Sequence, residues 1–306
     1  MSIPRDLRFT KKNPCPACGH GGSWCFMHSD KKGFWCGRAQ TYAGREGRKW
    51  KDGWIHSFAE GAAVASPIQS VGKSPAPPRR HRNFAKYAAR WQLATSAAQL
   101  SGLASQLHVS LSSLRLLGVG WASAAALKVL DTACRHAGCW SFPMRNGRGD
   151  VVGIRLRSPD GFKYAVDSSD GSGLFIPDGL PIGCDLLAVE GPTSLAAALT
   201  LGFAAIGRPN CRAGTDYLRE FIKRVKPARL VIVGDNDKPD SHGRRAGQES
   251  APIVAEQLLG ACPVVRSALP PAQFKDLRFW LQRGATAADI TQQFHIEPAM
   301  AGRIAI

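Results

Sequence analysis

The spacing of hydrophobic and polar residues divides the 306-residue chain into stretches with different predicted structure. Near the front, short stretches such as 33–36 and 54–56 have the alternating pattern of strands. From about 83 to 135, apolar residues recur at three- and four-residue spacing, as they do along one face of a helix. Between 140 and 176 the pattern returns to short strands. We therefore predict a β-rich front segment, a helical segment and a second β segment.

Residues 184–268 alternate apolar runs with helical patterns. Strands that alternate with helices of this length imply a parallel sheet, so the fold class is α/β. The residues after 268 are expected to add one or two helices. We predict strands over 186–190, 204–207, 230–235 and 264–268, and helices over 194–201, 216–224 and 248–259.

Length and composition suggest where the domains end. A chain of 306 residues and 32.9 kDa has room for two or three modest domains. Its residues 61–82 are rich in Pro and end in a basic run, which is typical of an extended linker. The predicted division is a β-rich domain over 1–60, a linker over 61–82, a helical and β segment over 83–183, an α/β domain over 184–270 and a helical tail over 271–306.

Positive charge is concentrated at the front of the chain. Lys and Arg number 40 against 23 Asp and Glu, a net charge of +17. Residues 1–90 hold 17 of these basic residues and 5 of the acidic ones, so they carry +12. Such a surface can serve solubility alone, but clustered Lys and Arg neutralise phosphates and release counterions. Nucleic acid is the expected partner.

The front of the chain also bears on location. Residues 1–13 are charged and lack the apolar segment of a secretory signal. No apolar run approaches the length of a transmembrane helix. Nine cysteines in such a chain indicate reduced thiols or metal ligands rather than disulfides. We expect a cytoplasmic protein with no membrane partner.

Four cysteines have the spacing of a metal site. Cys15-Pro-Ala-Cys18 lies in a Gly-rich stretch and is followed by Cys25 and Cys36. Four thiolates bind Zn²⁺ tetrahedrally in structural sites. His20 or His28 could replace one of them, and a redox dithiol is the other functional interpretation. The remaining cysteines lack such spacing and are expected in cores: Cys134, Cys139, Cys184, Cys211 and Cys262.

Carboxylates stand at the ends of two predicted strands. Glu190 ends the run 186–190, and Asp235 ends 230–235 and is followed by Asn236-Asp237. Ligand sites in α/β sheets collect at the carboxyl ends of strands. Magnesium prefers oxygen ligands and keeps several waters, so two or three carboxylates suffice. We predict that Glu190, Asp235 and Asp237 bind Mg²⁺ or Mn²⁺.

Basic residues lie on the strands that precede these acids. Arg145, Arg155, Arg157 and Lys163 fall within nineteen residues, and strand alternation puts Arg155 and Arg157 on the same face. A solvated sheet face is one interpretation. The functional one is a phosphate-binding ridge beside the metal site.

These features together resemble a known family. Glu190-Gly191 with Asp235-x-Asp237 looks like the Toprim domain of bacterial-type DNA primases, topoisomerases and some nucleases. The stretch from Phe142-Pro143-Met144-Arg145 through Gly153–Arg157 to Lys163-Tyr164 resembles the segment before Toprim in bacterial primases. The Cys₄ hairpin is similar to the zinc ribbon of the same family, especially in primases of phages and mobile elements.

The resemblance implies a zinc ribbon over 1–60, a primase core from 83 and a Toprim domain over 184–270. It implies a DNA primase that makes short RNA primers on single-stranded DNA from ribonucleoside triphosphates, with a replicative helicase as a possible partner. By resemblance, Glu190, Asp235 and Asp237 hold catalytic Mg²⁺, Arg145 and Lys163 contact nucleotide or template, and Asp276 is a weaker candidate from a later acidic motif.

Two alternatives stay open: a Toprim nuclease, or a non-catalytic zinc-ribbon and Toprim protein that binds DNA. The chain also departs from the family pattern at two places. Ser194 stands where the family often has Asp, and the Asp-x-Asp is followed by residues 238–244 instead of a compact Arg-Ala-Gly.

Overall fold

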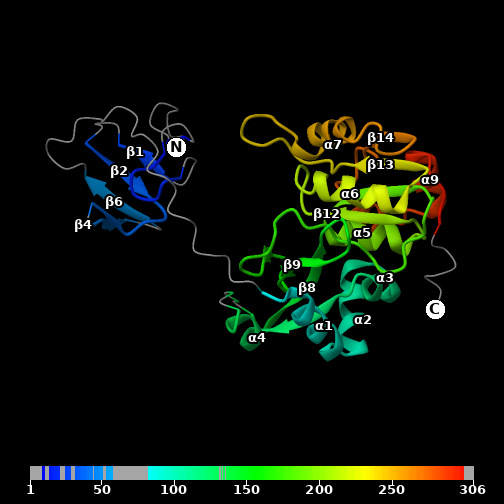
Figure 1. Ribbon diagram of the computed structural model, residues 1–306, viewed down its shortest axis with the longest axis horizontal. Coiled ribbons are helices and arrows are strands. Elements are labelled where there is room, and N and C mark those ends of the chain that lie inside the picture. The colour runs from blue at the N-terminus through cyan, green and yellow to red at the C-terminus, as the bar shows by residue number, and fades with distance from the viewer. Residues whose placement is uncertain are drawn as a thin grey trace. The chain divides into compact units, whose positions relative to one another are not determined.

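The computed structural model describes residues 9–10, 14–20, 25–28, 32–43, 45–50, 53–57, 82–130, 132, 134 and 136–299. The chain forms two compact units, Met1–Pro78 and Arg79–Ile306 (Figure 1). Of the predicted linker 61–82, only Arg82 is among the described residues, and 300–306 of the predicted tail also lie outside them. In the part that is described, every helix is too short or too polar to cross a bilayer.

The first unit is β-rich, as predicted. Its main sheet has the strand order β1-β2-β6-β5, and a small hairpin pairs β3 with β4. Alternation along the strands separates two faces. The buried face carries Cys25, Phe34, Cys36 and His56, and the other face is half-exposed. The strands are β1 (Cys25–Met27), β2 (Gly33–Cys36), β3 (Thr41–Tyr42), β4 (Arg45–Glu46), β5 (Arg48–Trp50) and β6 (Gly53–Ser57).

The second unit begins with helices and an antiparallel sheet of order β10-β9-β8-β7. The expectation of helix throughout 83–135 is wrong at one place, because Gly120–Ser123 is a strand. It pairs with β8 over its whole length, and a Cβ on Gly120 would lie 2.5 Å from the backbone of helix α1. The elements are α1 (Phe84–Ala94), α2 (Ala97–Leu107), α3 (Leu111–Leu116), β7 (Gly120–Ser123), α4 (Ala124–Lys128), β8 (Gly138–Arg145), β9 (Val151–Arg157) and β10 (Lys163–Ala165).

The predicted parallel sheet is present, with all strands parallel in the order β12-β11-β13-β14. Helix α5 packs on β11, β12 and α8, whereas α7 packs on β13 and β14. The elements are β11 (Leu186–Glu190), α5 (Gly191–Thr200), β12 (Ala205–Arg208), α6 (Thr215–Val225), β13 (Arg229–Val233), α7 (Ala246–Gln257), β14 (Val264–Ala268), α8 (Leu277–Gln282) and α9 (Ala287–Phe294).

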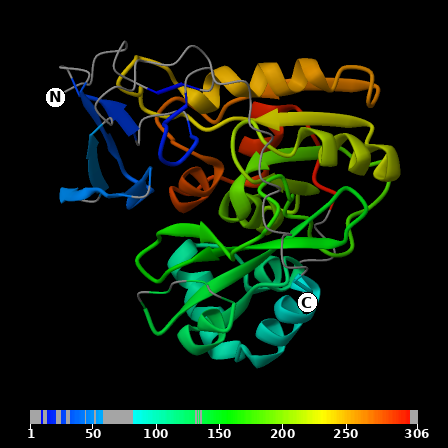
Figure 2. The ribbon, with the colours of Figure 1, turned by 60° about the vertical axis from the view of Figure 1, so that its left-hand side comes forward.

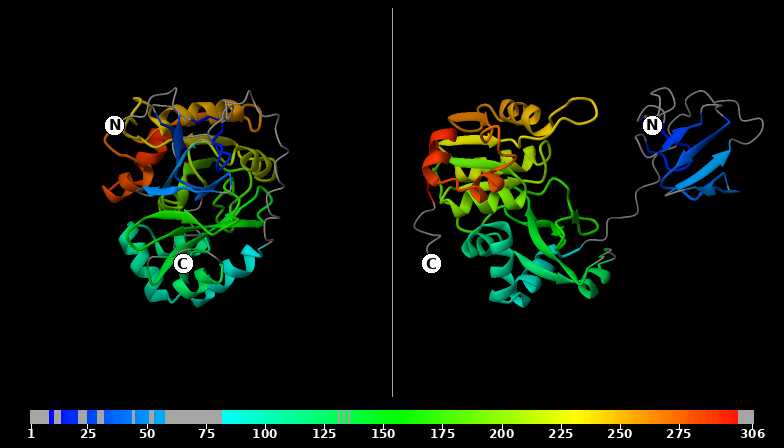
Figure 3. Two further views of the ribbon diagram at one scale, coloured as in Figure 1. Left: turned by 90° about the vertical axis from the view of Figure 1, so that its left-hand side faces the viewer. Right: turned by 180° about the vertical axis from the view of Figure 1, so that it is seen from behind.

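The antiparallel sheet is buried on both faces. Ile154 and Leu156 of β9 pack with Trp91 of α1, whereas Phe142 and Met144 of β8 belong to the core of the parallel sheet. Figures 2 and 3 show β8 and β9 as a layer between the cyan helices and the parallel-sheet region. Arg155 lies opposite Phe142 and Arg157 opposite Trp140. Their face of β9 is therefore the one turned toward the parallel sheet.

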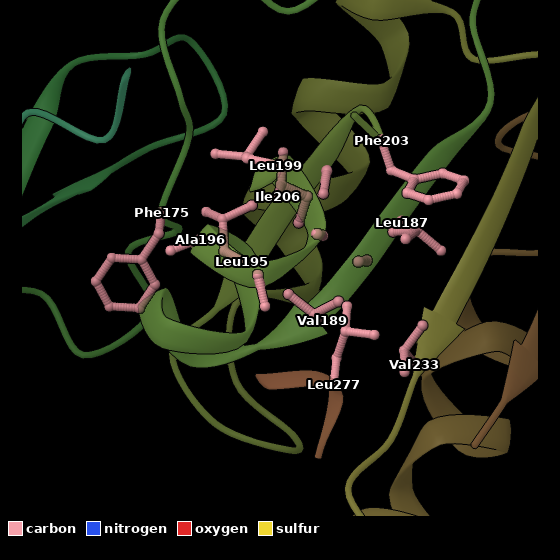
Figure 4. Packing of buried hydrophobic residues seen from close by; sticks show 14 of the residues in the cluster. Phe175, Leu187, Val189, Leu195, Ala196, Leu199, Phe203, Ile206, Val233 and Leu277 are labelled. Carbon is pink, nitrogen blue, oxygen red and sulfur yellow. The ribbon is translucent and has the colours of Figure 1, made fainter. Parts of the chain in front are cut away.

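The described residues of the second unit form two hydrophobic clusters, one on each face of the antiparallel sheet. Phe175 forms an isolated bridge with Gly207 of β12 and belongs to the larger cluster, which also includes residues of β11, α5, β13 and α8 (Figure 4). Helix α3 packs on α5, and Thr200 Oγ1 lies 3.3 Å from both Ser110 Oγ and Ser113 Oγ. The helical segment and the α/β region are thus parts of one compact unit. The strands of the antiparallel sheet are held in fixed relation to the carboxyl ends of the parallel strands.

Candidate functional site: an acidic edge beside a basic sheet face

Glu190 is the last residue of β11 and is the N-cap of α5, yet its carboxylate makes no capping hydrogen bond. Its Oε2 atom is buried and has no hydrogen-bond partner among the described residues. Burial raises the pKa of Glu190; Arg208 opposes this shift and Asp237 adds to it. A buried carboxylate oxygen without a partner is costly, and a cation would satisfy it.

Asp235 follows β13 at the same edge of the sheet. Its pKa is raised to about 8, first by burial and then by the charges of Glu190, Asp276 and Asp237 in that order. Helix α7 comes so close that a Cβ on Gly247 would lie 2.3 Å from the carbonyl oxygen of Asp235. The three neighbouring acids at this edge therefore each make ionisation of Asp235 harder.

Asp237 and Asp276 each give one carboxylate oxygen to a helix. Asp237 Oδ2 accepts from Gly247 N at 2.9 Å, in the first turn of α7. Asp276 Oδ1 caps α8 by accepting from Phe279 N at 2.7 Å. These bonds fix both side chains and leave the other oxygen of each outside the capping bond.

The acids come near one another without closing into a metal cage. Among the described residues, the group of side chains whose ligand atoms lie within 4.8 Å of one another is the four-cysteine cluster, not the acids. Magnesium sites keep several waters and use one or two direct carboxylates, so a wider spacing suits them.

Asn236, between the two aspartates, holds the neighbouring loop in place. Its side-chain amide donates to the carbonyl oxygens of Pro270, Pro271 and Phe274 at 2.9, 3.2 and 2.9 Å. Its backbone N–H donates to Lys275 O at 2.6 Å. Asn236 therefore brings Lys275 and Asp276 to Asp235. In the sequence, this residue is only the variable position of Asp-x-Asp, so its role could not be predicted.

Arg208 is a second residue that the sequence analysis missed. It ends β12 directly opposite Glu190 and is fully buried. Its guanidinium donates to Cys211 O at 2.7 Å and to Val233 O at 3.4 Å. The signal for Arg208 in the sequence is a charged residue at the end of an otherwise apolar run. Arg208 therefore places a fixed positive charge beside Glu190, on the neighbouring strand.

The basic residues of β9 and β10 lie on the face turned toward this edge. Arg157 and Lys163 are directly opposite each other across the two strands. The pKa of Lys163 is lowered first by desolvation and then by Arg157, while Asp276 and Asp235 oppose the shift. Arg278 of α8 similarly lowers the pKa of Arg157, after burial. Like charges held opposite each other are unfavourable unless an anion binds between them.

The two remaining predicted arginines have partners of their own. Arg155 donates to Pro209 O at 3.4 Å, in the loop that follows β12. Arg145 donates to Gly149 O at 3.0 Å and forms an ion pair with Asp178 at 3.4 Å. Arg155 thus reaches the carboxyl edge of the sheet, whereas Arg145 is held at the turn between β8 and β9. Ser194 is buried near the start of α5.

The four predicted cysteines come together in the first unit. Their Sγ atoms lie within 4.8 Å of one another, with 3.5 Å between Cys18 and Cys25 and 3.6 Å between Cys25 and Cys36. Tetrahedral zinc with bonds of about 2.3 Å separates sulfurs by ~3.8 Å, so the cluster fits Zn²⁺. His20 Nδ1 instead lies 2.7 Å from Cys18 O, and neither His20 nor His28 belongs to the group.

Backbone amides support this cluster. Ala39 N and Arg38 N donate to Cys36 Sγ at 3.2 and 3.4 Å. Burial raises the pKa of Cys36, but these two amides and the hydrogen bonds with Cys25 and Cys18 together lower it more, so the net shift is downward. Burial raises the pKa of Cys15 to about 11. Of the five other cysteines, Cys139 is buried as expected, and the rest are half-buried.

The outer face of the same sheet carries a row of three half-exposed side chains and one exposed arginine. Phe26, Trp35, Ile55 and Arg48 are neighbours in register across β1, β2, β6 and β5. Phe26 and Trp35 are stacked, with ring centroids 5.3 Å apart. A Cβ on Gly53 would lie 2.5 Å from the indole of Trp35. Glycine at this position thus leaves room for an aromatic platform that ends in an arginine.

A surface cavity lies away from the acidic edge. It has a volume of about 690 Å³ at the start of α6 and is lined by residues that include Arg212, Thr215 and Tyr217. None of the four acids lines it.

Comparisons with known proteins identify the fold. No family model matches the sequence, and no curated protein matches it either. A structure of the DnaG catalytic core matches with a TM-score of 0.52 and 17% identity, over 71% of this chain and 79% of that one. A DnaG primase catalytic domain bound to single-stranded DNA matches with a TM-score of 0.51 and 16% identity, over 71% and 80%. The chain therefore has the fold of the bacterial-type primase catalytic core, together with a four-cysteine β-rich unit that fits zinc.

Proposed function

We propose that the protein is a DNA primase that joins ribonucleotides on a single-stranded DNA template at the acidic edge. The observation that supports this most strongly is the pairing of opposite charges. Ionisation of Asp235, which follows β13, is opposed by Glu190, Asp276 and Asp237 and favoured by Lys275. The charge of Lys163 on β10 is in turn favoured by Asp276 and Asp235. The negative phosphates of a nucleoside triphosphate would match the basic residues, and its metal ions would match the acids.

The chain's own residues would then divide the work. Lys163 and Arg157, held opposite each other by strand register, would bind the triphosphate, with Arg278 beside them. Arg155 would contact phosphate near the loop after β12. Arg145, tied to Asp178, would contact nucleotide or template only if that ion pair opens.

Glu190, Asp235 and Asp237 would hold Mg²⁺ or Mn²⁺, with Asp276 as a further ligand. All donors are carboxylate oxygens, as magnesium prefers, and Glu190 Oε2 is buried without a partner among the described residues. When bound, such ions activate the attacking hydroxyl and stabilise the leaving pyrophosphate. The positive charge of Arg208, on the neighbouring strand, would hold the carboxylate of Glu190 in place.

The zinc-binding unit would hold the template. Trp35 and Phe26 offer a stacked aromatic surface, and Arg48 ends the row. Single-stranded DNA is bound in this way, by stacking of bases on aromatic rings and by attraction of the backbone to positive charge. Trp54 lies opposite Cys36 and so belongs to the other face, and Trp24 lies outside the described residues.

The test is incorporation of labelled ribonucleotides on single-stranded templates with Mg²⁺ or Mn²⁺. We expect wild-type protein to make short RNA products and Glu190→Gln to make at least about 100-fold less, as for loss of a group that stabilises transition-state charge. Asp216→Asn, an exposed acid at the start of α6, is the matched control and should leave synthesis unchanged.

Two other outcomes would replace the proposal. Metal-dependent nicking of DNA without added nucleotides would show a nuclease instead. Binding of DNA with a steep salt dependence and no metal-dependent product would show a non-catalytic DNA-binding protein.

A further inference from the structure

The segment between β13 and α7 is the most exposed charged loop near the acidic edge. Every residue from 238 to 245 is exposed. The segment has no large apolar side chain and carries Lys238, Arg244 and Arg245 against the single acid Asp240. Figures 1 and 3 show it extending away from the sheet, ahead of α7.

The base of this loop is closed by the acidic site itself. Asp237 Oδ2 accepts from Gly247 N, while Asp237 N donates to Gln248 Oε1 at 3.1 Å. Gln248 Nε2 donates back to Asp237 O at 3.2 Å. These three bonds join the two ends of the loop, so it leaves from and returns to the residue beside Asp235 and Asn236.

The tip of the loop is organised by Asp240. Its Oδ1 accepts from His242 N at 2.7 Å and from Arg244 N at 3.1 Å. Its Oδ2 accepts from Arg244 Nε and Nη2 at 3.2 and 3.0 Å, and Asp240 N donates to Arg244 O at 2.9 Å. The only acid in the loop is thus used to fix the turn.

Two cations remain for an external anion. Within the described residues, the side chains of Lys238 and Arg245 have no ion-pair or hydrogen-bond partner. Placing like charges on a turn held at base and tip lowers the entropy lost when an extended polyanion binds. A loop that only contacts solvent would need neither the hydrogen bonds at its base nor those at its tip.

We propose that residues 238–245 form a preordered clamp for the phosphate backbone of a nucleic acid strand held at the acidic edge. Lys238 and Arg245 contact phosphates, and Asp240 orders the turn that presents them. The inference rests on the proposed function only in that nucleic acid occupies this edge. The phosphates belong either to single-stranded template or to the RNA–DNA hybrid product.

The test is fluorescence anisotropy with a single-stranded DNA and with an RNA–DNA hybrid, over a series of salt concentrations and without nucleotides. We expect Lys238→Ser/Arg245→Ser to weaken binding and to reduce the log–log salt slope by about 1.4 to 1.8, the value for two phosphate contacts. Lys86→Ser/Arg90→Ser removes the same charge from the exposed side of α1 and is the control. Equal effects of the two double variants would overturn the proposal.

Asp240→Asn separates a preordered clamp from simple attraction. It removes a negative charge, so an unstructured charged surface would bind nucleic acid more tightly. A clamp ordered by Asp240 binds more weakly despite the added positive charge, and tighter binding would overturn the proposal. A loss limited to the hybrid assigns the clamp to the product duplex, and a loss on both probes assigns it to the template strand. The binding measurement involves no primer synthesis, so the proposed clamp can be confirmed even if the protein makes no primers.

Discussion

The two candidate metal sites of this protein differ in how far the chain alone satisfies them. The four thiols of the first unit converge within 4.8 Å and receive backbone N–H donors from Arg38 and Ala39. The acids of the second unit do not converge, and Glu190 Oε2 is left without a partner among the described residues. The first arrangement fits a closed structural metal site, and the second is an open edge whose negative charge bound cations would offset.

The largest effect should follow from removing a thiol. A structural zinc site supplies about 10–16 kcal/mol of apparent binding energy in small domains. We expect Cys36→Ser to lose bound zinc and to unfold the first unit, while the second unit keeps its melting transition. Zinc content and two-transition calorimetry of the full chain measure this. Cys262→Ser, at a half-buried thiol of the second unit, is the control. A normal first transition in Cys36→Ser would show that the cluster needs no metal.

A smaller effect should follow from releasing the loop that delivers Lys275 and Asp276. Asn236→Ala removes three side-chain hydrogen bonds to loop carbonyls, and we expect primer synthesis to fall about 10- to 100-fold, as for supporting residues of metal sites. Asn236→Asp should be worse than Ala, because it turns a carboxylate toward three carbonyl oxygens. Asn210→Ala, which loses similar loop bonds after β12, is the control. If the two alanine variants are equally active, Asn236 does not position the site.

The aromatic platform gives a further contrast within the first unit. Base stacking on an aromatic side chain contributes about 1–3 kcal/mol, so Trp35→Ala should weaken binding of single-stranded DNA at least about fivefold. Trp54→Ala, on the opposite face of the same sheet, should have little effect. Titration of labelled single-stranded DNA into each full-length variant measures this. A larger loss for Trp54→Ala would place the DNA on the other face.

The smallest effect should appear in stability. Because the pKa of Asp235 is raised to about 8, the folded state holds this proton more tightly than the unfolded state does. As the pH rises from about 4 to about 8, the unfolded state releases its proton first, and stability falls. In EDTA, Asp235→Asn should therefore melt about 2 °C or more above wild type at pH 8, with the difference vanishing near pH 4. If the difference in melting temperature between the two proteins is the same at every pH in this range, the pKa of Asp235 is not raised.

The sequence predicted strands better than supporting contacts. Strands β11 and β14 have the predicted bounds, because each is a short, mainly apolar run beside a helical pattern. Strand β7 was missed, since Gly120–Ser123 is a strand only through pairing with β8. The bonds of Asn236 reach thirty-four residues or more along the chain. Local patterns carry no information about such contacts, nor about the register that puts Arg208 opposite Glu190.

The proposed function requires that the acidic edge, and not the cysteine cluster, binds the catalytic divalent cations. Binding of Mn²⁺ to the zinc-loaded full chain, followed by electron paramagnetic resonance, tests it directly. We predict that wild-type protein binds Mn²⁺, that Asp235→Asn loses at least about tenfold in affinity, and that Asp216→Asn binds as wild type does. Equal Mn²⁺ affinity in wild type and Asp235→Asn would contradict the account.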